Sequence, residues 1–334
     1  MTTHRERLQI CIAGGHPDRT PAALWRHFPV DDQSPDALAA AHVAFQRTYD
    51  FDLLKVTPAS SFCLKDWGVD DVWEGHSEGT RRYVRQVIAD PGDWERLPLL
   101  DPHAGHLGAQ LACLRAIRSQ LGPEQPVLQT VFSPLAQAKH LASEDMLLVH
   151  LRKFPDAVIK GLETIAQSTR LFIEAAKETA IDGIFYAVQH ARASLLSMDE
   201  FAKFGRPYDL SILKAADDLW CNMLHIHGSD IYFEAVADYP VQILNWHDRE
   251  TSPSLAEAQR STVFKAGQAS VVCGGLGRDT LVYATSEVSA REARDAIQQT
   301  MGRGLLLSTG CVVPIIAPHG NLIAARDAAR AAVS

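Results

Sequence analysis

Short apolar segments that resemble β-strands alternate with longer amphipathic segments along the chain, and this order constrains the fold more than any other feature. The predicted strands span residues 51–56, 127–132, 183–188, 221–226, 241–244, 269–273 and 304–307. The predicted helices include residues 34–48, 155–180, 198–220, 252–264, 289–301 and 320–333. Because consecutive strand, helix and strand form a parallel pair through a right-handed crossover, the pattern predicts a parallel α/β fold.

The number of predicted strands favours one of two parallel architectures. Residues 21–25 supply an eighth strand, and eight parallel strands close a (β/α)8 TIM barrel, which suits a chain of 334 residues. We therefore predict one barrel domain over residues 1–334, with residues 1–20 as an N-terminal extension. A doubly wound open sheet with the same order of elements is the alternative.

Serine residues mark where helices are expected to begin. Ser34 and Ser252 each precede a proline, which combines a capping hydroxyl with a proline in the first turn. Ser197 and Glu200 have the spacing of a capping box. Each serine predicts that a helix starts at the next residue.

Charge and composition argue against several classes of function. The formal charge of −8 opposes a general affinity for nucleic acid or for an anionic membrane. We find neither an apolar run of about 18 residues nor an apolar signal segment near the first residues, so we expect a cytoplasmic protein without a membrane span. The six cysteines form no Cys-x-x-Cys pair, which argues against a disulfide framework.

Two histidines and a distant cysteine form the strongest candidate site. His225 and His227 end a predicted strand, where side chains two residues apart point to the same face. Cys311 follows another predicted strand. Two imidazoles and one thiolate that leave a fourth position open are typical of a catalytic zinc site. The alternative is a pair of ordinary hydrogen-bonded histidines and a buried cysteine.

Other polar residues follow predicted strands, at the end of a barrel where active sites are built. We interpret His190 as a catalytic acid or base, because the histidine pKa lies near neutral pH, and Gln189 as a substrate contact. An ordinary polar residue at the barrel rim is the alternative for His190. For His247 and Asp248 we favour an exposed loop over a position beside a metal ligand.

Three further residues near strand ends complete the predicted substrate-binding set: Ser133, Tyr186 and Asn245. The glycine-rich segment 274–277 also follows a strand. A tight turn explains it as well as a phosphate-binding loop does, because it lacks the Gly-x-Gly-x-x-Gly spacing of a dinucleotide site.

In the order of its motifs, nearly the whole chain resembles the uroporphyrinogen decarboxylase superfamily. The motifs that carry the resemblance are Phe132-Ser133-Pro134, the segment 186–208, Gly274-Gly-Leu-Gly277, and Gly310-Cys311-Val-Val-Pro314 followed by Asn321. The resemblance implies a (β/α)8 barrel, in agreement with the strand pattern.

Within this superfamily the chain is more similar to the zinc-dependent, cobalamin-linked methyltransferases than to true uroporphyrinogen decarboxylases. The decarboxylases carry an Arg-Gln-Ala-Gly-Arg segment, an aspartate and a late histidine, where this chain has residues 24–29, Ala59 and Gly310. The methyltransferases carry a His-x-Cys motif and a later cysteine. His225 and Cys311 match that motif, and His227 stands in place of its first cysteine.

The resemblance therefore implies a zinc-dependent methyltransferase with His225, His227 and Cys311 as metal ligands. It also implies a small-molecule substrate and an external methyl partner, either a corrinoid protein or tetrahydrofolate. Members of the family are often dimers, so a homodimer is an expected assembly. A decarboxylase (carboxy-lyase) that acts on a porphyrinogen or a smaller acid is one alternative, and a non-catalytic ligand-binding barrel is the other.

Overall fold

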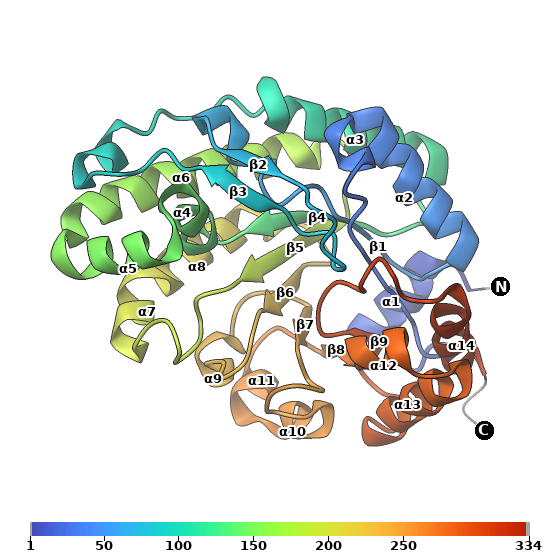
Figure 1. The fold of residues 1–334 in the computed structure, drawn as a ribbon. Helices are drawn as coiled ribbons and strands as arrows, with labels where there is room; N and C mark the ends of the chain where they lie inside the picture. The colour runs from blue at the N-terminus through green and yellow to red at the C-terminus, as the bar shows by residue number, and fades with distance from the viewer. Residues whose placement is uncertain (1, 332–334) are drawn as a thin grey trace.

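The computed structural model describes residues 2–331 and shows parallel strands surrounded by helices (Figure 1). Seven strands form one sheet in the order β1-β4-β5-β6-β7-β8-β9. They are β1 (Leu54–Val56), β4 (Val127–Phe132), β5 (Gly183–Val188), β6 (Met223–Ile226), β7 (Ile243–Trp246), β8 (Val271–Leu276) and β9 (Leu305–Thr309). An antiparallel hairpin is formed by β2 (Asp70–Val72) and β3 (Arg82–Arg85).

Helices surround the sheet, and the first of them covers one end of the barrel. They are α1 (His4–Ile12), α2 (Pro35–Tyr49), α3 (Gly105–Leu121), α4 (Pro134–Ala142), α5 (Glu144–Lys153), α6 (Pro155–Lys177), α7 (Met198–Phe204), α8 (Arg206–Ala215), α9 (Phe233–Val236), α10 (Leu255–Arg260), α11 (Thr262–Ala266), α12 (Arg278–Tyr283), α13 (Ser286–Gln299) and α14 (His319–Arg330). Short 3-10 turns occupy Asp31–Gln33, Lys65–Trp67 and Pro91–Arg96. Among the helices of residues 2–331, none combines the length and the apolar character that crossing a membrane requires.

The barrel closes through an extended segment at residues 21–25. The backbone N–H of Ala23 donates to the carbonyl of Leu307 in β9 at 3.0 Å, and the N–H of Asp52 donates to the carbonyl of Ala22 at 2.8 Å. This segment therefore joins β9 to the residues that precede β1. The predicted (β/α)8 barrel is confirmed, and the open-sheet alternative is wrong. The eighth position is held by a single parallel bridge between Ala22 and Leu307.

Local signals placed most helix starts correctly. Ser34 caps α2, and Ser197 with Glu200 forms the predicted capping box of α7. The start predicted after Ser252 is wrong, because Ser254 caps α10 and forms a capping box with Glu257.

Two predicted helices are each divided in the structure. The helix predicted over 198–220 is split at Gly205, where an added Cβ would lie 2.5 Å from the ring of Phe201. The helix predicted over 252–264 is split at Ser261, whose hydroxyl caps α11. The last predicted helix is α14, and its predicted residues 332–333 lie outside the described residues.

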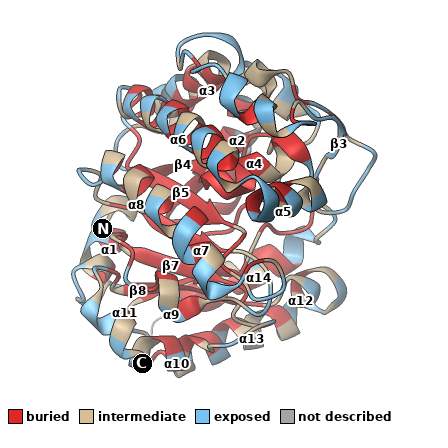
Figure 2. Ribbon diagram, turned by 90° about the vertical axis from the view of Figure 1, so that its left-hand side faces the viewer, coloured by how far each residue is buried: buried red, intermediate tan, exposed pale blue. Residues whose placement is uncertain are grey.

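Successive residues of each strand alternate between two apolar layers, one inside the barrel and one between the strands and the helices. The layer inside the barrel contains Leu53, Leu128, Phe185, Ala187, Met223, Ile243, Val271 and Leu306, among others. The residues between them along each strand pack outward against the helices. Figure 2 shows the consequence, with buried strands at the centre and helices whose outer faces are exposed.

Helix α1 covers the N-terminal end of the barrel. Leu8 and Cys11 pack into the interior layer, and the hydroxyl of Ser270, just before β8, donates to the carbonyl of Ile12 at 2.6 Å. The predicted N-terminal extension thus forms a plug at the end where the strands begin. The polar residues that follow the strands lie at the opposite, C-terminal end of the barrel.

Candidate metal centre

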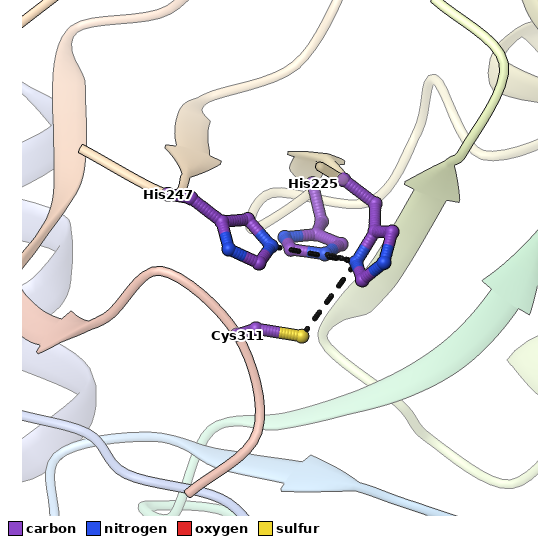
Figure 3. A group of neighbouring side chains, drawn as sticks. His225, His247 and Cys311 are labelled. Carbon is purple, nitrogen blue, oxygen red and sulfur yellow. Dashed lines mark hydrogen bonds between the residues drawn. The ribbon is translucent and has the colours of Figure 1, made fainter. Parts of the chain in front are cut away.

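Three histidines and one cysteine meet at the C-terminal end of the barrel. His225 lies in β6, His227 directly follows that strand, His247 directly follows β7, and Cys311 follows β9. Figure 3 shows the side chains of His225, His247 and Cys311 converging from these separate segments. One donor atom from each of the four residues lies within 4.8 Å of the others.

The register of the sheet directs these side chains to one point. Leu224 and Ile226 of β6 pack in the outer layer, so His225 and His227 face the interior. The loop that carries Cys311 approaches β7 closely at Gly310, where an added Cβ would lie 2.5 Å from the Cα of His247. Glycine at position 310 therefore allows the thiol to reach the histidines.

The distances within the cluster fit a tetrahedral metal ion. His227 Nδ1 lies 3.4 Å from His225 Nε2, 3.4 Å from His247 Nε2 and 3.8 Å from Cys311 Sγ. With Zn–N bonds of ~2.0–2.1 Å and a Zn–S bond of ~2.3 Å, tetrahedral donors are separated by roughly 3.3–3.6 Å. Imidazole and thiolate are also the ligands that zinc prefers. The donor set therefore fits Zn²⁺ in number and type, and the two nitrogen–nitrogen distances match tetrahedral spacing, whereas the nitrogen–sulfur distance is slightly longer.

Burial keeps the imidazoles in the form that binds metals. Desolvation, together with the neighbouring His247, lowers the pKa of His227 to about 3, and desolvation also takes the pKa of His225 well below its usual range. Both rings are therefore neutral near pH 7 and offer a lone pair. Burial raises the pKa of the Cys311 thiol, with Arg278 opposing the shift.

Asn245 fixes the orientation of His225. Its Nδ2 donates to the backbone carbonyls of Cys273 at 2.9 Å and Thr309 at 3.0 Å, so its Oδ1 must be the atom that faces His225 Nδ1 at 2.7 Å. That oxygen accepts the Nδ1 proton, which leaves the lone pair of Nε2 directed at the cluster. On the other side, Glu250 Oε2 holds His247 Nδ1 at 3.2 Å.

Replacing Asn245 with alanine is expected to lower the metal affinity by about 10- to 100-fold, the usual cost of losing a group that orients a metal-bound histidine. Competition with a chromophoric chelator measures this. Asn321→Ala, at a buried asparagine outside the cluster whose Nδ2 also donates to two backbone carbonyls, is the matched control and should retain the affinity. Equal affinity in Asn245→Ala and the parent protein contradicts the assignment.

A cavity of about 250 Å³ opens beside the cluster. Its wall combines residues of the strand ends with residues of the segment that follows β1: Trp25, His27, Lys55, Thr57, Ser60, Glu78, Arg81, Tyr83, Lys139, His140, Phe185, Gln189, His225, His227 and Cys311. The hairpin β2–β3 borders this cavity, and two contacts of Tyr83 in β3 hold it there. The hydroxyl of Tyr83 lies 2.9 Å from that of Ser60, and the Tyr83 ring stacks on His140 with centroids 4.0 Å apart.

Some of the site residues predicted from the sequence lie at the cluster or on the cavity wall. The structure brings together the three predicted metal ligands, His225, His227 and Cys311. Gln189 lines the cavity, where its Oε1 accepts from Lys139 Nζ at 3.0 Å. Asn245 lies behind His225 instead of on the cavity wall, because its side chain is held by two backbone carbonyls.

Three other predicted site residues lie away from the cavity wall. Tyr186 faces outward in β5, and its hydroxyl donates to buried Asp209 at 2.6 Å. The hydroxyl of Ser133 caps α4. His190 is fully buried, and within residues 2–331 neither of its ring nitrogens has a hydrogen-bond partner. None of the three lines the cavity, so their predicted catalytic or substrate-binding roles have no structural support.

Sequence reasoning missed two residues that the site contains. His247 was read as part of an exposed loop, although it stands two residues after Asn245, the same spacing that joins His225 to His227. Lys55 was passed over inside an apolar strand. A lysine in such a strand is rarely buried without a function, and this signal was available in the sequence.

Comparisons with known proteins agree with this fold. The curated methylcobamide:CoM methyltransferase MtbA of Methanosarcina mazei is 20% identical over 244 residues, which cover 72% of this chain and 68% of that protein. A solved methyltransferase structure from Methanosarcina mazei superposes with a TM-score of 0.85 at 18% identity, over 98% of this chain and 99% of that one.

A more distant likeness is to a B12-independent methionine synthase from a Shewanella species, solved in complex with selenomethionine. It has a TM-score of 0.56 and 14% identity over 94% of both chains. The family model described as uroporphyrinogen decarboxylase (URO-D) matches residues 3–332. The chain therefore belongs to the uroporphyrinogen decarboxylase (URO-D) family.

Proposed function

We propose that this chain is a zinc-dependent, methyltransferase-like enzyme that moves a methyl group between a small substrate and an external carrier. The observation that carries the proposal is the cluster of His225, His227, His247 and Cys311 at the edge of a cavity. The methyltransferase relatives support it. A bound Zn²⁺ would lower the pKa of a coordinated thiol or water and provide a nucleophile at neutral pH.

The size of the cavity favours a small substrate. At about 250 Å³ it is smaller than the roughly 300–1,000 Å³ pockets that hold drug-sized ligands. A tetrapyrrole with its acidic side chains is larger than such ligands. The dimensions therefore favour methyl transfer on a small molecule over decarboxylation of a porphyrinogen.

The four donors differ in how firmly the protein holds them. His225 is supported by buried Asn245 at 2.7 Å, whereas His247 is supported at 3.2 Å by Glu250, whose side chain is 46% exposed. Glu250 is also shared with Arg278, which reaches Glu78 on the cavity wall at 2.5 Å. His247 would therefore be the most easily displaced of the four donors if a substrate atom bound to a metal held by the cluster.

The methyl carrier in this proposal comes from outside the chain. The name of the curated relative refers to a methylcobamide, which favours a corrinoid protein over tetrahydrofolate. The carrier would approach the C-terminal end of the barrel, where the donor cluster and the cavity lie.

Anaerobic incubation of the zinc-loaded protein with methylcob(III)alamin and a series of small thiols tests the proposal. We expect thiol-dependent loss of the methyl group, followed by the absorbance change of the corrinoid, and only background rates in Cys311→Ser. Absence of transfer from both methylcob(III)alamin and methyltetrahydrofolate, with conversion of uroporphyrinogen to coproporphyrinogen, would establish the decarboxylase alternative instead.

A further inference from the structure

Lys55 is a charged residue in the interior of the barrel. It occupies the middle of β1, between residues 54 and 56 of the outer layer, and its side chain therefore points inward. It is 4% exposed and lines the cavity beside the metal cluster. Its ammonium nitrogen lies 4.5 Å from the centre of the Phe185 ring.

The other charged side chains of the cavity wall have partners. Glu78 pairs with Arg278 at 2.5 Å, Arg81 with Asp32 at 2.7 Å, and Lys139 with Glu144 at 3.7 Å.

Among the described residues, no carboxylate forms an ion pair with Lys55, and the groups that favour its charged form are Cys311 and the face of the Phe185 ring. Burial accordingly lowers the pKa of Lys55 to about 7. A buried cation without a counter-ion is costly, and an anionic ligand removes that cost.

We propose that Lys55 pairs with an anionic group of the substrate, so that the substrate is a small acid whose other end reaches the metal cluster. The first half of this inference rests on the cavity alone, and the second half rests on the proposed function. A carboxylate, a sulfonate or a phosphonate has the required charge and acceptor atoms.

The geometry limits the length of this substrate. The Phe185 ring contacts both Lys55 and His225, with its centroid 4.5 Å from Lys55 Nζ and 5.2 Å from the imidazole centroid of His225. Lys55 Nζ is therefore no more than 9.7 Å from that imidazole. A linker of a few carbon atoms spans this interval, and the Phe185 ring provides an apolar surface along it.

A matched pair of ligands tests the inference. 3-Mercaptopropionate and its neutral amide have nearly the same shape and differ in charge. Calorimetric titration of the zinc-loaded protein is expected to show the acid binding about 10- to 100-fold more tightly than the amide, the range for a hydrogen bond to a charged group. Lys55→Met should remove this preference. Lys65→Met, which changes a lysine that is paired with Asp71 at 3.3 Å outside the cavity wall, should retain it.

Two further measurements separate the possible failures. Metal-free protein titrated with propionate and propionamide tests Lys55 independently of the metal. If the protein never retains zinc but prefers propionate, and Lys55→Met removes that preference, the anion site is supported and the proposed zinc-dependent function is wrong.

Acetic anhydride labelling of the parent protein, measured by mass spectrometry, reports on Lys55 even if the variant fails to fold. The acid should protect Lys55 from labelling more than the amide does. Equal binding of acid and amide, no binding of either, or a preference that survives Lys55→Met overturns the inference.

Discussion

Replacing His227 with alanine is expected to leave the purified protein with far less than one equivalent of zinc. His227 Nδ1 is the donor that lies within 3.8 Å of the donor atoms of all three other residues. Structural zinc sites with four donors bind with roughly 10–16 kcal/mol, so one donor contributes about 3 kcal/mol. Its loss should lower the affinity by at least about 100-fold. Elemental analysis before and after dialysis against a chelator measures the change.

Two variants make this experiment specific. His227→Cys restores the thiolate of the related methyltransferase motif and should retain zinc. His190→Ala removes another buried histidine that follows a barrel strand but lies outside the cluster, and it should leave the zinc content unchanged. A full equivalent of zinc in His227→Ala, or no zinc in the parent protein, contradicts the metal assignment.

The fold could be predicted because its signals are local. The strands β4 and β5 are buried on both faces, and their predicted bounds coincide with the observed ones. Apolar periodicity alone did not show the break of the helix at Gly205, although Gly205 followed by Pro207 marks such a break in the sequence. The eighth position was also harder to predict, because the segment 21–25 contributes only one bridge to the sheet.

The alternation of strand side chains explains only part of the predicted metal cluster, because Cys311 follows another strand and was predicted from its place after β9 and from the family resemblance. His225 and His227 share a face of β6, which the period of two residues reveals. The position of His247 depends on the pairing of His225 with Asn245 across β6 and β7, and that register is a tertiary property. The same period explains why Tyr186 faces the outer layer, because it stands three residues before Gln189 and an odd separation changes the face of the sheet.

Replacing Asp52 with asparagine is expected to lower the free energy of unfolding at pH 7 by about 3 kcal/mol. The Asp52 side chain is 1% exposed and lies where the barrel closes, accepting hydrogen bonds from Arg7 at 2.8 Å and Arg19 at 2.8 Å. Removing one partner of a buried ion pair costs ~3–5 kcal/mol. The low end applies because Arg7 keeps its contact with Asp18. Asp50→Asn, at a neighbouring carboxylate that is 57% exposed, should cost less than about 1 kcal/mol.

The dependence of this effect on pH identifies its cause. Burial alone would raise the pKa of Asp52, but the hydrogen bond from His4 and the charge of Arg19 outweigh it and lower the pKa to about 2. The pKa in the unfolded chain is about 3.9, so the ionised carboxylate stabilises the fold above ~pH 4, and this contribution disappears as the pH falls from ~4 to ~2. Urea unfolding midpoints of the parent protein and Asp52→Asn should therefore differ at pH 7 and converge across that interval. A difference that stays constant down to pH 2 would mean that asparagine disturbs the packing at the barrel closure, and that the charge of Asp52 contributes little to its stability.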